Sequence, residues 1–304
     1  MTSNIKITFL GTASAVPTKE RNHSSILVSY ADENILIDCG EGTQRQFRKA
    51  KLSPMRLTRI LITHWHGDHV LGIPGLLQTL TLNGYNKTLE ISGPKGTKKF
   101  MRNLLKTFVF TGKIKLKITE IDSDKKILEK KDLLIEANKV FHGIPALSYN
   151  IIKKGQIRID KMKLKQTGLP HGKFLHGLKQ GKNIQHKGKT YFAKDLTYKE
   201  NEKKISVILD TGFDNRLISY AKNADLLIIE SSFSSELKNK EQLNYHLTSS
   251  QSATIAKKAN VKKLILTHLS QRYETENEQK KILNEAREVF KKTFIANDFD
   301  KIEI

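Results

Sequence analysis

Short apolar runs alternate with amphipathic segments along most of the chain. Residues 25–30 alternate apolar and polar side chains, which is typical of a half-buried strand. Residues 274–292 gather their apolar side chains on one helical face, which indicates a long amphipathic helix. Strands are predicted at residues 6–10, 25–30, 34–37, 60–62, 89–92, 114–120, 133–140, 147–152, 205–209, 226–229, 263–266 and 293–295, and helices at residues 42–50, 73–82, 98–105, 249–259 and 274–292. This alternation predicts an α/β sandwich with helices on the outside.

A weak internal repeat relates the two halves of the chain. In each half, one apolar strand ends in Asp-x-Gly, at Asp38 and at Asp210. A later strand in each half ends in Thr-His, at His64 and at His268. Two such halves facing each other would gather their strand-end side chains at one place.

Four candidate metal ligands follow the apolar run at residues 60–62, namely His64, His66, Asp68 and His69. His64 and His66 are two residues apart, so near a strand end both can point the same way. Gly67 permits a sharp turn, after which Asp68 and His69 can face the same point. Imidazole nitrogen and carboxylate oxygen are donors that Zn²⁺ prefers, so the cluster predicts a metal site.

Three further ligand types come directly after apolar strands: His142, Asp210 and His268. Taken singly, each could be a packed histidine or a capping aspartate. Together, they supply the additional metal ligands that the cluster lacks. Four ligands crowd one ion that keeps an open position, so we expect two ions. The expected ligand sets are His64, His66 and His142 for one ion, and Asp68, His69 and His268 for the other. Asp210 has two oxygens and could bridge ions that lie roughly 3.5–4 Å apart.

Composition limits the remaining possibilities. The 304 residues, 38% of them hydrophobic, are enough for a substantial core. No apolar run reaches the roughly 18 residues of a membrane span, and the N-terminus has no pattern of a signal peptide. Cys39 is the only cysteine, which excludes an intramolecular disulfide and fits a cytoplasmic protein. We expect Cys39 to be packed in the core and not to bind metal.

The charge of the chain is strongly basic, with a formal net value of +22. Such a surface attracts polyanions, and nucleic acid is the expected partner. Residues 153–204 contain fifteen Lys or Arg residues against four acidic residues, with several glycines and few apolar residues available for burial. We expect a folded or partly ordered basic arm here, the alternative being a disordered linker. The catalytic domain would then comprise residues 1–152 and 205–304.

The histidine motif and its later partners resemble the signature of the metallo-β-lactamase superfamily. Within it, the chain resembles the ribonuclease Z family of tRNA 3′-processing endonucleases over nearly its whole length. The loop Pro17-x-Lys19-x-Arg21-Asn22 and the basic insertion narrow the resemblance to this family. Residues 38–46, 141–144 and 266–270 also match, whereas residues 168–172 match the Gly-Pro-rich stretch of the family's arm more loosely.

The resemblance implies a four-layer αβ/βα sandwich that is active as a homodimer. It implies hydrolysis of one phosphodiester bond in precursor tRNA, leaving a tRNA 3′-hydroxyl and a trailer with a 5′-phosphate. Two Zn²⁺ per subunit are expected because the ligands are rich in histidine, with Mn²⁺ as an alternative. The arm would bind tRNA.

Four residues receive roles in the reaction. Asp68 can orient the attacking water or take its proton, and the family assigns it the role of proton acceptor. Asp38 either orients a histidine ligand or caps a turn. His246 resembles the family's His-x-Thr element and is the candidate acid for the departing 3′ oxygen. Glu230 could hold His246, or be an ordinary carboxylate at a strand end.

The loop after the first strand is assigned to tRNA binding. Lys19 and Arg21 are expected to grip the acceptor end, and Asn22 to fix the loop. Without the resemblance, the same loop would be interpreted as merely solvated. The remaining histidines are not expected to bind metal: His23, His171, His176 and His186.

Two other functions remain open at this point. Another hydrolase on the same fold, such as a glyoxalase II-like thioesterase or a general phosphodiesterase, would share every metal ligand but would not need the arm or the charge. A basic RNA-binding protein with a structural zinc would need a closed site that is typically rich in cysteine. The single cysteine argues against the second alternative.

Overall fold

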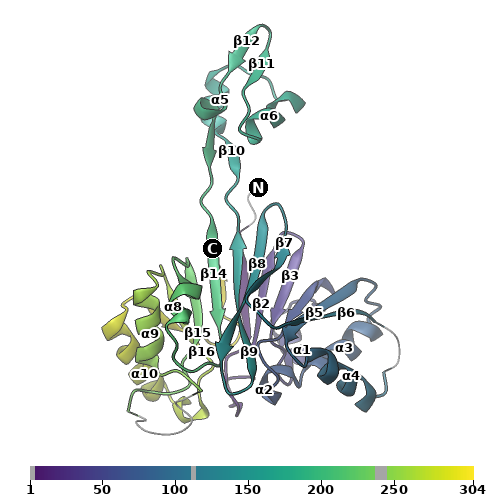
Figure 1. The fold of residues 1–304 in the computed structure, drawn as a ribbon, viewed down its shortest axis with the longest axis vertical. Coiled ribbons are helices and arrows are strands. Elements are labelled where there is room, and N and C mark those ends of the chain that lie inside the picture. Colours follow the sequence, from purple (N-terminus) through teal and green to yellow (C-terminus); the bar gives the residue numbers. More distant parts are fainter. Residues whose placement is uncertain (1–3, 111–113, 237–244) are drawn as a thin grey trace.

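Two mixed β-sheets form the centre of the computed structural model, which describes residues 4–110, 114–236 and 245–304 (Figure 1). The first sheet has the order β18-β1-β2-β3-β4-β5-β6. Its strands are β1 Lys6–Gly11, β2 Ser25–Tyr30, β3 Glu33–Ile37, β4 Arg59–Leu61, β5 Thr88–Pro94, β6 Lys115–Ile121 and β18 Lys301–Glu303. The second sheet has the order β17-β16-β15-β14-β9-β8-β7. Its strands are β7 Lys125–Glu129, β8 Leu133–Phe141, β9 Pro145–Lys153, β14 Lys203–Ile208, β15 Leu226–Glu230, β16 Leu264–Thr267 and β17 Thr293–Ile295.

The main hydrophobic core lies between the two sheets, where buried strand residues such as Val28 from the first sheet and Val207 from the second belong to one cluster. Tyr149 crosses this interface, because its hydroxyl donates to the carbonyl of Ile62 at 2.7 Å. Helices cover the outer faces. Those on the first sheet are α1 Thr43–Lys49, α3 Ile73–Leu82 and α4 Thr97–Thr107, and those on the second are α8 Arg216–Ala221, α9 Ser249–Lys258 and α10 Glu276–Val289. The layers therefore form the expected αβ/βα sandwich.

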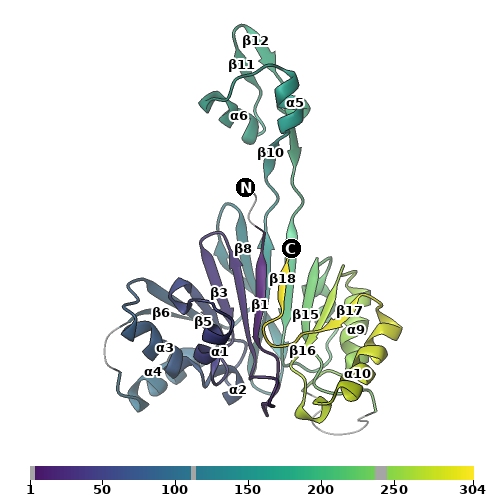
Figure 2. The same cartoon turned by 180° about the vertical axis from the view of Figure 1, so that it is seen from behind.

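Parallel strands bring the predicted ligands to one edge. β3, β4, β5 and β6 run parallel to one another, as do β14, β15, β16 and β17. Because parallel strands end at the same edge of a sheet, their C-terminal loops meet there. The short helix α2 Gly67–Val70 lies at this edge, at the bottom of the body in both views (Figures 1 and 2).

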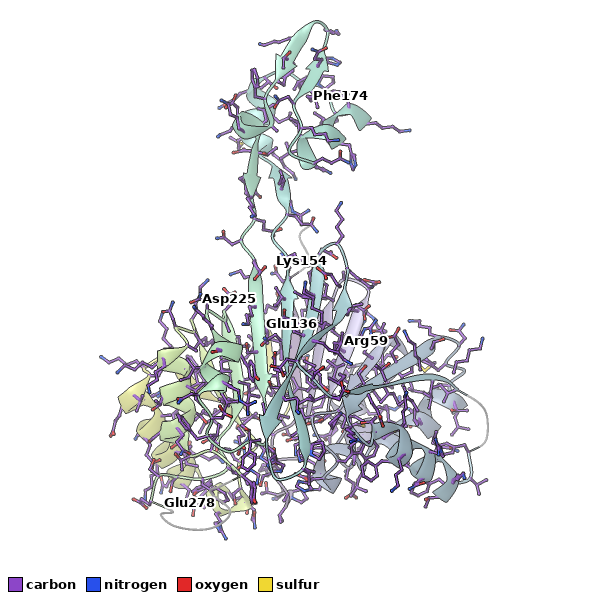
Figure 3. All side chains as sticks on the ribbon, in the orientation of Figure 1. Arg59, Glu136, Lys154, Phe174, Asp225 and Glu278 are labelled. Carbon is purple, nitrogen blue, oxygen red and sulfur yellow. The ribbon has the colours of Figure 1, made fainter. Side chains whose placement is uncertain are left out.

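The basic insertion projects as an arm from the opposite edge, at the top of both views (Figures 1 and 2). It contains β10 Ile157–Ile159, α5 Lys161–Gln166, α6 His176–Lys179, β11 Ile184–His186, β12 Lys189–Tyr191, α7 Ala193–Leu196 and β13 Thr197–Lys199. Its small core consists of Leu164, Leu169, Leu175, Leu178, Ile184, Ala193 and Leu196. In Figure 3, Lys154 lies where the arm leaves the body and Phe174 lies in its head. The arm is thus folded. More of its apolar side chains are buried than the sequence analysis expected.

Several elements differ from the sequence prediction. Strand β7 and helix α8 were not predicted, and residues 293–295 are not the last strand, as the sequence prediction had them. The chain continues past that strand into β18, which crosses to the other sheet and pairs with β1. Strands β9 and β14 pair through Lys153 and Lys203, so residues at both ends of the predicted insertion 153–204 belong to the sheet. Among helices in the described ranges, none is long and apolar enough to cross a membrane.

Candidate metal centre

All seven predicted metal ligands meet at the lower edge of the sandwich. They occur in two groups that share Asp210: one with His64, His66 and His142, and one with Asp68, His69 and His268. Within each group, the candidate ligand atoms lie within 4.8 Å of one another. The grouping matches the two sets expected from the sequence.

In the first group, three imidazole nitrogens converge. His66 Nδ1 is 3.0 Å from His64 Nε2 and 3.1 Å from His142 Nε2. Asp210 Oδ2 lies 3.7 Å from both Nε2 atoms. Donor atoms arranged tetrahedrally around Zn²⁺ at 2.0–2.1 Å would be separated by roughly 3.3 Å. These spacings therefore fit a common cation.

The second group has the same dimensions. His69 Nε2 is 3.2 Å from His268 Nε2 and 3.2 Å from Asp68 Oδ2. Asp210 Oδ1 is 3.0 Å from His268 Nε2 and 3.4 Å from His69 Nε2. Each oxygen of Asp210 thus faces a different group, which is the geometry of a bridging carboxylate.

Asp210 provides an independent test of whether a cation fits. Its side chain is buried, and Oδ1 has no hydrogen-bond donor within the described residues. A buried carboxylate oxygen without a donor is costly unless a cation compensates it. The protein therefore has a carboxylate that requires positive charge at the point where the histidines converge.

Hydrogen bonds outside the ligand sets fix the orientation of four histidines. His142 Nδ1 donates to the carbonyl of Tyr245 at 2.8 Å, and His69 Nδ1 donates to Asp38 Oδ2 at 2.6 Å. The same Asp38 oxygen accepts from the Thr63 hydroxyl at 2.6 Å, so the Thr63 oxygen can accept from His64 Nδ1 at 3.1 Å.

His268 is held by a similar relay. The Ser232 hydroxyl donates to Glu230 Oε2 at 2.6 Å, and its oxygen accepts from His268 Nδ1 at 3.0 Å. In all four histidines the proton is placed on Nδ1, which leaves the lone pair of Nε2 pointing into the site. His66 differs, because it faces the site through Nδ1.

The pKa values of the site follow from its burial and its carboxylates. Burial lowers the pKa of His64 and of His142, which favours the neutral imidazole that a metal ligand needs. At His69, burial opposes protonation, but Asp210, Asp38 and Asp68 outweigh it and raise the pKa well above the usual value. At Asp210, burial acts against ionisation, yet His268 and His69 hold the pKa well below its usual range. The site therefore attracts positive charge.

His246 lies beside this centre, as expected for the candidate acid. Its Nδ1 is 3.1 Å from Glu230 Oε2. Glu230 is fully buried and is pinned through its other oxygen, which accepts from the backbone N–H of Thr211 at 2.7 Å. Burial opposes protonation of His246, but the charge of Glu230 outweighs it and raises the pKa to about 9. A protonated imidazole is thus held next to the cluster through its Nδ1.

A cleft of about 510 Å³ opens onto the centre. Its lining combines Asp68, His246 and His268 with residues that the sequence analysis did not assign: Ser14, Ala15, Val16, Ser232, Phe233, Ser270, Gln271 and Arg272. Arg272 is exposed and carries a positive charge into this lining. Its position four residues after His268 could have marked Arg272 as a residue of the site. The Thr-His repeat could likewise have marked Thr63 as a hydrogen-bond partner behind the ligands.

The three residues of the basic loop have different environments. Lys19 is exposed, whereas Arg21 is only 5% exposed. The guanidinium of Arg21 donates to Thr12 Oγ1, the carbonyl of Ala296, Gln279 Oε1 and Asn297 Oδ1 at 2.5–3.1 Å. The prediction that Arg21 grips tRNA is therefore wrong in this structure, because internal acceptors hold its guanidinium.

Asn22 fixes the loop, as the sequence analysis expected. Its side chain donates to the carbonyl of Glu41 at 2.7 Å, and its backbone N–H donates to Asp298 Oδ2 at 2.9 Å. Within this loop, Lys19 is the exposed cation. The histidines not expected to bind metal lie outside the ligand groups found among the described residues, and Cys39 is buried, as expected.

Comparison with known proteins gives full-length relatives. The chain is 36% identical to the ribonuclease Z of Enterococcus faecalis, over 99% of this chain and 97% of that protein. It is 37% identical to the ribonuclease Z of Nanoarchaeum equitans, over 88% of this chain and 84% of that protein. Residues 5–120 also match the family model described as Anti-Pycsar protein Apyc1, which covers the part that contains the histidine motif.

Solved structures agree with these relatives. The short form of human tRNase Z superposes with a TM-score of 0.71 at 25% identity, covering 98% of each chain. The metallo-β-lactamase fold protein YhfI from Bacillus subtilis gives the same TM-score at 20% identity over 99% of this chain and 100% of that chain, and this likeness supports the fold alone. Given identity above one third along nearly the whole chain, on this fold and with this ligand set, the chain belongs to the ribonuclease Z family of metallo-β-lactamase fold proteins.

Proposed function

We propose that the chain is a metal-dependent endoribonuclease that removes the 3′ trailer of precursor tRNA. The observation that carries the proposal is the double ligand group around Asp210, in a chain that matches ribonuclease Z over its full length. The reaction hydrolyses one phosphodiester bond and leaves a 3′-hydroxyl on the tRNA and a 5′-phosphate on the trailer. A general hydrolase on this fold would need neither the basic arm nor the net charge of +22.

Two Zn²⁺ ions per subunit are the proposed cofactors. His64, His66 and His142 would hold one ion, Asp68, His69 and His268 the other, and Asp210 would bridge them. Five imidazoles against two carboxylates favour zinc, although Mn²⁺ also accepts such donors. When bound, the ions would lower the pKa of the attacking water and neutralise negative charge on the phosphate.

The protein's own side chains would move the protons. Asp68 lies half-buried in the cleft, and burial opposes its ionisation, but His69 and His268 hold its pKa far below the usual range. It therefore stays ionised and can orient the water, and the likeness to the family is the reason for proposing it also as the acceptor of the water's proton. His246 is kept protonated by Glu230 and can donate a proton to the departing 3′ oxygen.

Lys19 is the proposed contact of the loop with the acceptor end of the tRNA. Hydrogen bonds of Arg21 and Asn22 anchor the loop, so the exposed Lys19 is carried by a fixed backbone. Arg272, in the lining of the cleft, offers a second positive charge near the phosphate. These roles follow the general rule that phosphate contacts position a nucleic acid.

Residues 153–204 are proposed to be a tRNA-binding exosite separate from the catalytic domain, residues 1–152 and 205–304. A groove of about 1010 Å³ in the arm supports this, because cations line it together with Tyr198. The cations are Arg158, Lys161, Lys173 and Lys179. Such a groove suits an RNA backbone, with an aromatic ring available for contact to a base.

The position of the arm favours a homodimer. Strand β9 begins three residues after His142 and ends at the base of the arm, so its nine residues separate the two sites by roughly 30 Å. The arm also points away from the metal centre (Figure 1). We propose that the arm of one protomer holds tRNA whose 3′ end occupies the centre of its partner. A cytoplasmic location belongs to the same proposal, since the single buried Cys39 fits a reducing compartment.

The function is tested by incubating the purified protein with a 3′-extended precursor tRNA and mapping the cut. The expected result is one cut at the end of the tRNA body, abolished by a chelator and restored by Zn²⁺. Asp68→Ala should lose this activity while the purified protein remains folded. Full cleavage by Asp68→Ala would show that the proposed chemistry is wrong.

A further inference from the structure

Two exposed aromatic rings stand at the rim of the metal centre, and nothing in the proposed chemistry uses them. Phe141 is 51% exposed and Tyr245 is 40% exposed. Their ring centroids are 5.6 Å apart with an angle of 33° between the planes. Exposed aromatic residues are common singly, but a contiguous pair beside a reaction centre indicates a surface that contacts a ligand.

The backbone fixes both rings to a metal ligand. Phe141 directly precedes His142 at the end of β8. The carbonyl of Tyr245 accepts from His142 Nδ1 at 2.8 Å, and the two rings lie 6.4 Å apart at 85°. The backbone of Tyr245 therefore orients a ligand, while its side chain remains partly exposed to solvent.

Gly143 lets the ring of Tyr245 lie close to this backbone. It has a positive φ of 75°, and a Cβ at this position would lie 3.0 Å from the ring of Tyr245. A side chain here would be strained and would push the tyrosine ring away. The ring of Tyr245 thus lies directly against the turn that follows His142.

The geometry points to a stacking platform, made by Phe141 and Tyr245, for the base of the last nucleotide of the tRNA body. This inference rests on the proposed function, because it needs RNA at the centre. The cleaved phosphate must lie at the ligand groups, one of which includes His142, so an adjacent base can reach the rings. Tyr245 directly precedes His246, the candidate acid for the departing 3′ oxygen, and that oxygen belongs to the last tRNA nucleotide. Aromatic side chains stack on any base, so the platform would hold this nucleotide without reading its identity.

The test compares Phe141→Leu and Tyr245→Leu with wild type on three precursor tRNAs. One is intact, one is abasic at the last nucleotide of the tRNA body, and one is abasic at the first trailer nucleotide. Tyr245→Phe keeps the ring. Phe294→Leu is the matched control, because Phe294 is 43% exposed on the edge strand β17, where its ring lies against Lys263 and Arg287 and not against a metal ligand. Bound zinc and sedimentation are measured for each variant to confirm an intact centre and an unchanged assembly.

Both leucine variants should lose roughly tenfold in kcat/KM on the intact precursor, mainly through KM, which is the size of one lost base–aromatic stack. Wild type should lose a similar factor on the precursor that is abasic at the last tRNA nucleotide, and the variants should add no further loss there. On the precursor that is abasic in the trailer, both leucine variants should still show the tenfold loss in kcat/KM. Tyr245→Phe and Phe294→Leu should behave as wild type.

Equal losses on all three precursors, no loss on any, or a loss that accompanies a changed sedimentation coefficient would each overturn the platform. The last result would identify the ring pair as a contact between subunits. Failure of the proposed function looks different, since wild type would then not cut the intact precursor at all.

Discussion

Replacing Arg21 by methionine removes a buried cation and keeps an unbranched side chain of comparable length. The structure assigns Arg21 to the support of the loop, not to tRNA. The variant should therefore lower the free energy of unfolding, whereas Lys19→Met, at an exposed position of the same loop, should leave it nearly unchanged. The two substitutions form a matched pair because both remove one positive charge.

The magnitude follows from the acceptors that lose their donor. Gln279 and Asn297 are partly or fully exposed, so water can replace the guanidinium there. Thr12 and the carbonyl of Ala296 are buried, and each would be left without this donor. Leaving two buried acceptors without a donor lowers the free energy of unfolding, and no longer having to bury a charge offsets part of this loss. The net destabilisation is about 3 kcal/mol. With a urea slope of about 3 kcal/mol per molar, the unfolding midpoint should fall by about 1 M.

The loss should also depend on pH through Asp298. Burial raises the pKa of this carboxyl, and the charge of Arg21 acts against that rise. A carboxyl with a raised pKa in the folded state stabilises the fold at low pH and loses this contribution as pH rises through the folded pKa. Arg21→Met raises that pKa further, so the destabilisation should be larger at pH 7 than at about pH 4.5.

Urea unfolding followed by far-UV circular dichroism measures the stability, and precursor tRNA binding at several salt concentrations measures the contact. Lys19→Met should reduce the salt dependence of log K by about one unit, as the loss of one phosphate contact does. If Arg21→Met kept the wild-type unfolding midpoint and showed this reduced salt dependence instead, the assignment of Arg21 to the loop support would be refuted.

Three further predictions concern the centre and the arm. His246→Ala should slow cleavage of precursor tRNA by 10²–10⁴-fold, and the loss should vanish on a phosphodiester with an activated leaving group; persistence of the loss would contradict the acid role. Asp38→Ala should lower the zinc affinity by 10–100-fold, measured by competition with a chromophoric chelator, because the orientation of His69 is lost; Asp32→Ala, at an exposed carboxylate that pairs with Lys130, is the control. Replacing residues 154–202 by a short turn should weaken tRNA binding but spare hydrolysis of bis(p-nitrophenyl) phosphate, and equal loss on both substrates would exclude the role of the arm as an exosite.

The ligand set could be predicted because local sequence patterns determine it. A strand of apolar residues followed by histidines places polar donors at a sheet edge, whichever partners the strand has. The same pattern occurs at His64, His142, Asp210 and His268, and the structure brings all four to one edge. The two strands that lead into Thr63-His64 and Thr267-His268, β4 and β16, lie in different sheets, as the repeat indicated.

The roles of residues in the basic loop could not be predicted in the same way. Lys19 and Arg21 are alike in charge and lie in one exposed-looking stretch. Arg21 is buried because Ala296 and Asn297, 275 and 276 positions away in the sequence, supply two of the acceptors for its guanidinium. The folding of the arm was likewise underestimated, because its scattered leucines lack a clear period and meet only in three dimensions.

By itself, the sequence determined the kind of site, the seven candidate ligands and the basic insertion, since these depend on residue types and short spacings. Tertiary structure alone decided how Asp210 divides its oxygens between two groups, which nitrogen each histidine presents, and that the arm lies at the opposite end of the sheet from the centre. The physical reason is that hydrogen-bond partners and burial are set by packing between distant segments. Local periodicity places a side chain on a face of the protein but does not determine what it contacts there.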